Sequence, residues 1–393
     1  MQTWRFLEYL RLWLVTSLLA ASIAGAPAYA RTDDSGNSEE TEFAEFEAVR
    51  IAGPFETPWS LAFLPDHAIL LTERPGRLQL IRPGAAPRDV EGLPVMQNAG
   101  LGGLLDIAVD PDFARNRLVY FSYTHGHADA STLRVMRARL DVARHRLSHR
   151  RVLFETADAP ERAEQHGGRL ALTRHGFLYL SVGDRWQTDA AQNLSSHLGK
   201  IIRIRTDGSI PPDNPFVGVA DARPEIWSYG HRNPQGLAFE EAAGRLWSHE
   251  HGPMGGDELN LIRPGRNYGW PVITHGIGYD GKPVGIGSAK EGMEQPFHPI
   301  EVAIAPSGLA VESSGPVTVF WVGALAGQSL FRLEAENGRV VQETRLLHEE
   351  VGRIRDVRIG PDGLLYIVTD DAEGALYRLD PVQEQVRRGK GSL

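Results

Sequence analysis

The residues best suited to chemistry in this chain lie between Pro224 and Pro271. The segment combines an arginine beside an asparagine, two histidines on either side of a glutamate, a Gly-Pro turn and two adjacent acids. Few of these residue types are common in a buried core, so we take the segment as the first candidate for a functional site. Its residues of interest are Arg232, Asn233, His249, Glu250, His251, Gly252, Pro253, Asp257, Glu258 and Tyr268.

The Gly252-Pro253 turn and the acids that follow it predict a site for a cation. A Gly-Pro turn presents backbone carbonyls outward, and Asp257 and Glu258 add carboxylates a few residues later. Ca²⁺ is bound by oxygen ligands of these kinds. A polar turn with a solvated pair of acids is the alternative. A zinc site at the two histidines is a weaker alternative, because no third ligand is evident.

Three arginines are candidates for holding an anion. Pro234 restricts Asn233 to an extended conformation, which fixes the direction of Arg232, and a fixed guanidinium can hold an anion or a developing oxyanion. Arg353 and Arg355 lie two residues apart and therefore share one side of a strand. Ion pairs within the protein are the alternatives: Glu225 for Arg232, and Glu349, Glu350 or Asp356 for the other two arginines.

A third block, Gln165-His166-Gly167-Gly168-Arg169, places a histidine beside two glycines. The small neighbours leave room for a substrate near the imidazole, which is suited to proton transfer. An exposed loop histidine is the alternative. Asp184 and the segment Asn193 to Lys200 follow in the chain and could line the same face.

The elements that position these residues are repeated strands. Six copies of an alternating apolar strand, a turn and a second strand follow one another, with further strands such as Arg77–Ile81, Thr132–Leu140 and Lys200–Arg205 between copies. Strand-only repeats of this size predict an all-β fold, a six-bladed β-propeller, in preference to a β-sandwich pair. The widest gaps follow copies two, three and four, where we expect the loops that form the site. The copies align on Leu61, Ile107, Leu170, Leu237, Leu309 and Val357.

Composition and the chain ends indicate an exported protein. Residues 1–30 have the basic start, short apolar run and small-residue cleavage site of a signal peptide, which predicts a periplasmic or secreted protein without stable membrane insertion after cleavage. Residues 31–47 read as a disordered acidic leader, 48–382 as the propeller and 383–393 as a flexible tail. The net charge of −9 argues against a nucleic-acid partner, and the absence of cysteine excludes disulfides.

Several motifs resemble the soluble PQQ-dependent aldose sugar (glucose) dehydrogenase family, over nearly all of the chain after residue 54. They are GHRNPQGLAF at Gly230–Phe239, HGPMGGDELNLI at His251–Ile262, NYGWP at Asn267–Pro271 and RIRDVRIGPDGLLYIVTD at Arg353–Asp370. That family has a six-bladed propeller, in agreement with the repeat count.

The resemblance implies a cofactor, PQQ, and calcium. A calcium ion at the carbonyls of Gly252 and Pro253 would polarise the quinone, and Arg232, with Asn233 beside it, would stabilise charge on the quinone oxygen. Arg353 and Arg355 would meet the cofactor's carboxylates, while a histidine takes the proton of the sugar hydroxyl. A second calcium would involve Glu258 and the carbonyl of Tyr268, with Asp257 as a further candidate ligand.

Three positions depart from the family pattern. The family's base lies four residues before the arginine of its Gly-Arg-Leu motif, where this chain has Gln165, and His166 stands one place late. Glutamine cannot act as a general base. Leu101 replaces a family glutamine that meets the base and the cofactor, and Ala326 replaces a lysine that binds PQQ.

These observations favour oxidation of an aldose, or of a related small-molecule sugar or alcohol, by hydride transfer to PQQ, with calcium as a Lewis acid and an electron acceptor that the sequence does not identify. One alternative is a calcium-binding propeller that binds a sugar-like ligand without turnover. Another is a calcium-propeller lactonase or other hydrolase, for which Asp106, Asp184 and Asp356 are available carboxylates. The sequence does not specify the oligomeric state.

Overall fold

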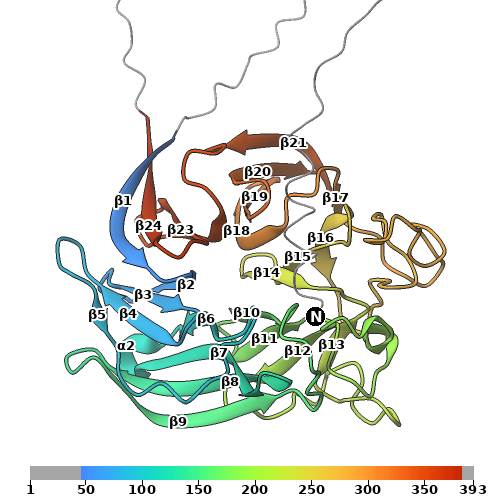
Figure 1. Cartoon of the computed structure of the whole chain (residues 1–393), viewed down its shortest axis with the longest axis horizontal. Coiled ribbons are helices and arrows are strands. Elements are labelled where there is room, and N and C mark those ends of the chain that lie inside the picture. The colour runs from blue at the N-terminus through green and yellow to red at the C-terminus, as the bar shows by residue number, and fades with distance from the viewer. Residues whose placement is uncertain (1–45, 383–393) are drawn as a thin grey trace, which may run out of the picture. The chain divides into compact units, whose positions relative to one another are not determined.

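The computed structural model describes residues 46–382, which form six four-stranded antiparallel sheets around a central axis (Figure 1). The predicted six-bladed β-propeller is confirmed. The signal peptide, most of the acidic leader and the tail expected from the sequence lie outside the described residues. Among the residues from 46 to 382, no helix has the length and apolar character needed to cross a membrane.

Five blades follow the chain in order, and the sixth joins its two ends. Blade six pairs β22, β23 and β24 with β1, so a strand from the start of the described chain closes the ring. β1 begins at Phe46, two residues before the expected boundary at 48. The strands of blades one to three are β2 (Pro58–Phe63), β3 (Ile69–Glu73), β4 (Arg77–Ile81), β5 (Arg88–Asp89), β6 (Leu104–Val109), β7 (Leu118–His127), β8 (Ala130–Asp141), β9 (Arg146–Glu155), β10 (Gly167–Leu172), β11 (Phe177–Val182), β12 (Lys200–Arg205) and β13 (Ile226–Tyr229). Those of blades four to six are β14 (Pro234–Glu240), β15 (Arg245–Glu250), β16 (Asp257–Ile262), β17 (His298–Ile300), β18 (Pro306–Ser314), β19 (Val317–Ala324), β20 (Ser329–Glu336), β21 (Arg339–Leu346), β22 (Ile354–Ile359), β23 (Leu365–Thr369), β24 (Gly374–Pro381) and β1 (Phe46–Phe55).

The sequence repeats correspond to the two inner strands of each blade. All six alignment positions fall on the first strand of a blade, and the expected strands Arg77–Ile81 and Lys200–Arg205 coincide with β4 and β12. Both faces of a blade are buried because each face packs on a different neighbour. Within residues 46–382, six clusters of buried apolar side chains occupy the six contacts between neighbouring blades.

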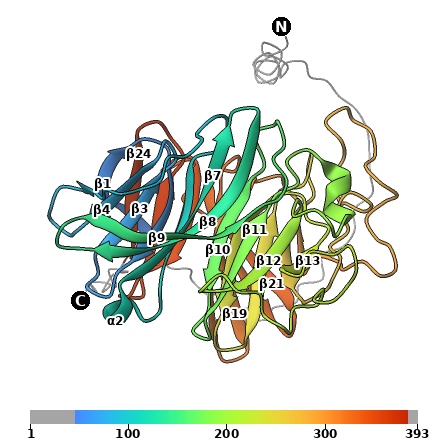
Figure 2. The same ribbon diagram turned by 90° about the horizontal axis from the view of Figure 1, so that it is seen from below.

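The strand register places all the candidate loops at one end of the propeller. In every blade the start of the first strand pairs with the end of the second, as Pro234 pairs with Glu250 and Ile354 with Thr369. Loops that precede a first strand and loops that follow a second strand therefore open at the same end, which we call the site face. The short helix α2 (Phe113–Asn116) lies between β6 and β7 at the opposite end (Figure 2).

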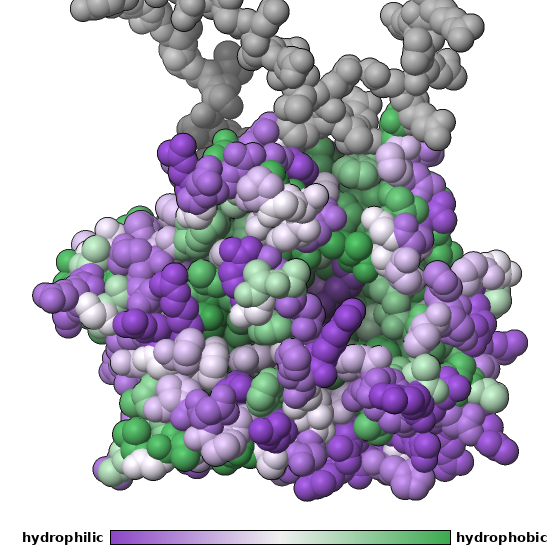
Figure 3. Space-filling view, turned by 180° about the vertical axis from the view of Figure 1, so that it is seen from behind, coloured by the Kyte–Doolittle hydropathy of each residue, from purple (hydrophilic) through white to green (hydrophobic). Residues whose placement is uncertain are grey.

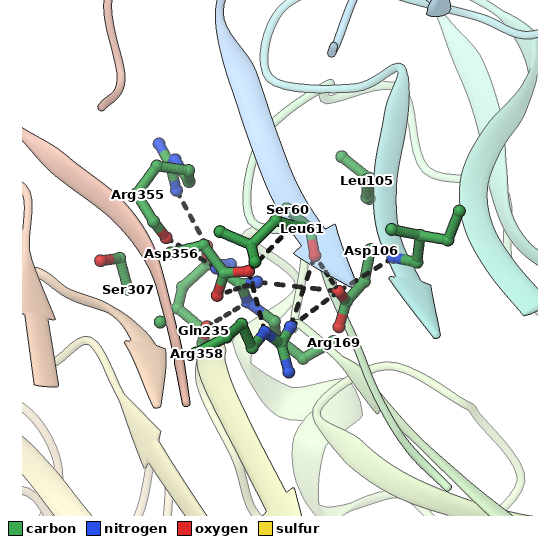
Figure 4. A network of polar contacts seen from close by, with 12 residues as sticks. Ser60, Leu61, Leu105, Asp106, Arg169, Gln235, Ser307, Arg355, Asp356 and Arg358 are labelled. Carbon is green, nitrogen blue, oxygen red and sulfur yellow. Dashed lines mark hydrogen bonds and ion pairs between the residues drawn. The ribbon is translucent and has the colours of Figure 1, made fainter. Parts of the chain in front are cut away.

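A largely buried network of ion pairs joins the first strands of several blades (Figure 4). Arg169 Nη1 lies 2.8 Å from Asp356 Oδ1, and Arg358 binds both Asp356 and Asp106 at 2.9 Å. The Arg169 guanidinium also stands 4.0 Å from the ring centroid of Trp59. Two guanidinium groups thus balance two carboxylates, and the network joins strands of blades one, two, three and six.

Candidate functional site

On the site face, two arginines form ion pairs with one carboxylate. Arg353 Nη2 and Arg355 Nη2 lie 2.9 and 3.0 Å from Asp370 Oδ2. Neither arginine takes Glu349, Glu350 or Asp356 as its partner, the pairings that the sequence left open. Asp370 directly follows β23, so the pairing of β23 with β22 brings it beside both arginines.

A third arginine, Arg74, adds to this positive charge and was missed by the sequence analysis. It follows β3 on the site face, close enough to Asp370 and Arg355 to interact electrostatically with both; burial, together with Arg355, lowers its pKa. Its guanidinium makes no hydrogen bond within residues 46–382. Gly103 allows the neighbouring loop to pass Arg74, because a Cβ there would lie 1.8 Å from the Arg74 carbonyl oxygen.

Arg232 lies on the site face just before β14, with its guanidinium directed at the Gly-Pro turn. Nη1 donates to the carbonyl oxygens of His251 at 3.2 Å and Gly252 at 2.6 Å. Its backbone N–H donates to Glu250, and only 4% of the residue is exposed. The alternative partner, Glu225, instead contacts His197 at 2.6 Å. Among residues 46–382, no carboxylate contacts the Arg232 guanidinium, so Arg232 is a fixed cation without an ion pair in that range.

The Gln165 side chain lies between Arg232 and Asp184. In the amide orientation that satisfies both neighbours, the oxygen accepts from Arg232 Nη2 at 3.0 Å and the nitrogen donates to Asp184 Oδ1. Asp184 also accepts N–H bonds from Trp186 at 2.9 Å and Trp270 at 2.8 Å. Burial raises the pKa of Asp184. Gly183 makes the approach possible, since a Cβ there would lie 2.0 Å from the Gln165 carbonyl oxygen.

His166 points to a different environment from Gln165. It is 4% exposed rather than an exposed loop histidine, and neither ring nitrogen has a hydrogen-bond partner among the described residues. Burial and the Arg185 guanidinium lower its pKa to about 3, so the ring is neutral at pH 7. Gln165 has a left-handed backbone conformation, with φ of 53°. This interrupts the alternation of a regular strand and leaves glutamine, not histidine, beside Arg232.

The Gly252-Pro253 turn is held in place by Asp257. One carboxylate oxygen accepts the Gly252 N–H at 2.9 Å, and the other accepts the N–H groups of Ile304 and Ala305 at the same distance. Both oxygens of Asp257 are thus engaged in shaping the loop. The Gly252 carbonyl oxygen already accepts from Arg232 Nη1 at 2.6 Å, so only its second lone pair is open to a bound cation.

Two further carboxylates form a buried pair beside this turn. Glu258 lies opposite Glu250 in the register of β15 and β16, and burial together with Glu250 raises its pKa to about 8. Glu250 accepts from His231 Nδ1 at 2.8 Å, and the His231 ring stacks on Tyr268 at 4.7 Å. Adjacent carboxylates of this kind favour a bound cation, which would offset their repulsion. Within the described chain, no group of three or more acidic, histidine or cysteine side chains has the geometry of a complete metal site.

The remaining expected residues form the edges of the site. The Asn233 Oδ1 atom accepts from Gln235 at 3.1 Å, and Gln235 in turn accepts from Arg355 at 3.3 Å. Leu101 is 50% exposed. Ala326 is exposed beside Leu325, whose carbonyl accepts from Arg353 at 3.3 Å. None of Asn233, Leu101 and Ala326 can therefore serve as a general base.

Sequence reasoning missed Arg74, Asp370, Trp186 and Tyr279 as members of the site. A signal existed for the first two, because each directly follows the second strand of a repeat, as Gly183 and His251 do. No local signal marks Tyr279, which lies in the long loop between β16 and β17. That loop returns to the site face where Ile277 pairs with Met254.

Comparison with known proteins identifies the family. The family model for glucose/sorbosone dehydrogenases matches residues 55–378. The chain belongs to this family. The aldose sugar dehydrogenase YliI of Escherichia coli (strain K12) is 38% identical over 335 residues, which are 82% of this chain and 90% of that protein.

Solved structures of family members share the fold. The apo form of the soluble aldose sugar dehydrogenase Asd of Escherichia coli has a TM-score of 0.82 at 36% identity, covering 86% of this chain and 100% of that chain. The PQQ-bound form of the aldose sugar dehydrogenase Adh from Streptomyces coelicolor has a TM-score of 0.72 at 29% identity, covering 86% and 98%. These two solved relatives are aldose sugar dehydrogenases, one of them with PQQ bound.

Proposed function

We propose that this chain oxidises an aldose, or a related sugar or alcohol, with PQQ as hydride acceptor and calcium as Lewis acid. The observation that carries the proposal is the charge at the site face. Arg353 and Arg355 form ion pairs with Asp370, and Arg74 lies near enough to interact electrostatically with Asp370, so this part of the site face has an excess of positive charge. An anionic cofactor with several carboxylates fits this surplus of positive charge.

The residues of the site take defined parts in this proposal. The three arginines around Asp370 would hold the cofactor's carboxylates, and the carbonyls of Gly252 and Pro253 would hold calcium. When bound, PQQ supplies a hydride acceptor that Ca²⁺ polarises. Arg232 would stabilise negative charge that develops beside it, because its guanidinium is held in place and almost completely buried. Asp184 would keep the Gln165 amide oriented toward Arg232.

A second candidate is a propeller that binds the cofactor or a sugar without turnover. The observation in its favour is that Gln165 contacts Arg232 where a base is expected, while His166 is buried. Loss of a general base costs about 10²- to 10⁴-fold in rate. The two candidates therefore share the binding site and differ in the proton transfer.

Reconstitution tests both candidates. Purified full-length protein is mixed with PQQ and Ca²⁺, the spectrum of bound cofactor is recorded, and aldoses are then added with an artificial electron acceptor. Bound PQQ with dye reduction supports oxidation, and bound PQQ without reduction supports the second candidate. Absence of bound cofactor at micromolar PQQ would refute the oxidative proposal. Arg355→Gln serves as a binding control, because it removes a charge from the cluster.

A further inference from the structure

The site face carries a pair of exposed aromatic residues that have no assigned role in the proposed reaction. Trp186 and Tyr279 are 38% and 61% exposed, and they are the only aromatic residues among the exposed large apolar side chains of residues 46–382. Their ring centroids lie 5.8 Å apart with an interplanar angle of 49°. The two rings come from different loops, so the pair exists only in the folded chain.

The pair borders Arg232 directly. The Arg232 guanidinium carbon lies 5.6 Å from the Trp186 ring centroid and 5.9 Å from that of Tyr279. Arg232 Nη2 also donates to the Tyr279 hydroxyl at 3.3 Å, which leaves the hydroxyl proton available to another acceptor. A ligand against these rings would therefore touch the same guanidinium that contacts Gln165.

The backbone holds Trp186 outward at a conformational cost. Arg185 and Trp186 both have left-handed backbone angles, with φ of 53° and 63°, which non-glycine residues adopt at the expense of free energy. The conformation is fixed by the Asp184 carboxylate, which accepts the Trp186 N–H at 2.9 Å. Arg185 anchors the same turn by donating to the carbonyl and hydroxyl of Ser131 at 3.2 and 3.0 Å. Strain of this kind is typical of sites where exposure of the side chain serves binding.

Two other exposed apolar residues are connected to the loop that carries Tyr279. Ile277 and Met254 are 45% and 47% exposed and pair through their backbones. On the other side, the Arg162 guanidinium stacks 5.4 Å from the Trp186 ring. The adjacent residue, Ala163, accepts the N–H of Leu101 at 2.8 Å. Exposed apolar surface gathered beside polar groups marks a ligand site.

We propose that Trp186 and Tyr279 form an aromatic wall that binds the apolar face of a closed sugar ring beside Arg232. A pyranose has C–H groups on its ring faces, which pack on aromatic rings, and hydroxyl groups at its edge, which suit Arg232 and the Tyr279 hydroxyl. The wall favours a closed ring over an open-chain polyol. This inference rests on the proposed sugar substrate and specifies which residues recognise it.

Binding of a sugar that cannot react at the anomeric carbon tests the wall separately from turnover. The probe is 1,5-anhydroglucitol, a pyranose without the anomeric hydroxyl, compared with the open-chain polyol sorbitol. Titrations followed by ligand-observed NMR use the full chain, with and without PQQ and Ca²⁺. Wild type is expected to bind the ring more tightly than the open chain. Each of Trp186→Ala and Tyr279→Ala is expected to weaken ring binding about 3- to 10-fold.

Matched variants distinguish recognition from a general loss of structure. Trp186→Phe keeps an aromatic face and is expected to retain most of the affinity, while Val341→Ala changes an exposed apolar residue of β21 and is expected to have no effect. Equal ring affinity in wild type and the double variant Trp186→Ala, Tyr279→Ala would overturn the wall, as would the absence of ring binding by wild type. Ring binding that depends on the wall, without any oxidation, would instead refute the proposed reaction and leave the wall standing.

Discussion

Removal of the Asp370 carboxylate tests the charge cluster on which the proposed function rests. Burial alone would raise the pKa of Asp370, but Arg355 and Arg353 outweigh it and lower the pKa from 3.8 to about 2. A pKa lowered by this much corresponds to about 2 kcal/mol of folding free energy at neutral pH. The side chain is only 15% exposed, so solvent screening reduces this value little.

The sign of the pH dependence follows from the lowered pKa. The charged carboxylate stabilises the folded state above the unfolded pKa near 4, and this contribution is lost as the pH falls toward 2. Asp370→Asn should therefore lower the free energy of unfolding by about 2 to 3 kcal/mol at pH 7. At pH 3 the difference between wild type and variant should be about half as large.

Urea unfolding at pH 7, 5 and 3 measures this difference. Glu350→Gln is the matched control, because this exposed carboxylate lies three residues from Arg353 and has no ion pair in the described structure. A difference that stays constant across pH, or an equal cost for Glu350→Gln, would refute the reasoning.

PQQ should raise the melting temperature of the wild-type protein, because Arg353 and Arg355 would bind its carboxylates. An equally large rise in a variant that lacks both arginines would show that the cofactor binds elsewhere.

Three other predictions concern proton transfer, the cation site and the buried ion-pair network. Gln165→His combined with Ala326→Lys should raise the rate of dye reduction by the protein with PQQ and Ca²⁺ bound about 10²-fold or more, because the variant has a base beside Arg232 and a cation at the edge of the site. An unchanged rate with PQQ bound would show that positions 165 and 326 do not correspond to the family's base and lysine. Millimolar Ca²⁺ should raise the melting temperature, and Glu258→Gln should abolish most of that rise; an equal rise in the variant would place the cation away from the buried acid pair. Arg358→Met should lower the free energy of unfolding in urea by about 3 to 5 kcal/mol, because it removes one of the two guanidinium groups that pair with Asp106 and Asp356. A decrease below about 1 kcal/mol would show that this network does not stabilise the propeller.

The propeller could be predicted from the sequence because its repeating unit is local. An alternating strand, a turn and a second strand are encoded within about 20 residues, and each alignment position, such as Leu61 or Val357, falls on the first strand of its blade. Because neighbouring blades bury both faces of every sheet, short apolar strand segments between turn residues are the signal to expect in each repeat. The closing pair of β1 with β24 joins the two ends of the described chain, and no local pattern marks that contact.

The segment from Pro224 to Pro271 and the paired arginines Arg353 and Arg355 were recognisable by residue type and spacing alone. Their partners were not. Asp370, Arg74 and Tyr279 reach the site through strand pairing and a long returning loop, and a sequence does not reveal which distant loops meet. The backbone conformation at Gln165 likewise decides that an amide, and not the imidazole of His166, contacts Arg232.

Figure 3 shows the propeller from the side opposite to Figure 1, with a hollow near the middle whose floor is hydrophilic.

The fold, the family resemblance and the residue types available for chemistry were thus readable from the sequence, because all three depend on local patterns. Tertiary structure alone decided which charges neutralise one another and which side chains remain free to meet a ligand. Coulombic and hydrogen-bond energies depend on distances between atoms from different blades, and burial changes their strength. Those distances exist only once the six blades have closed into a ring.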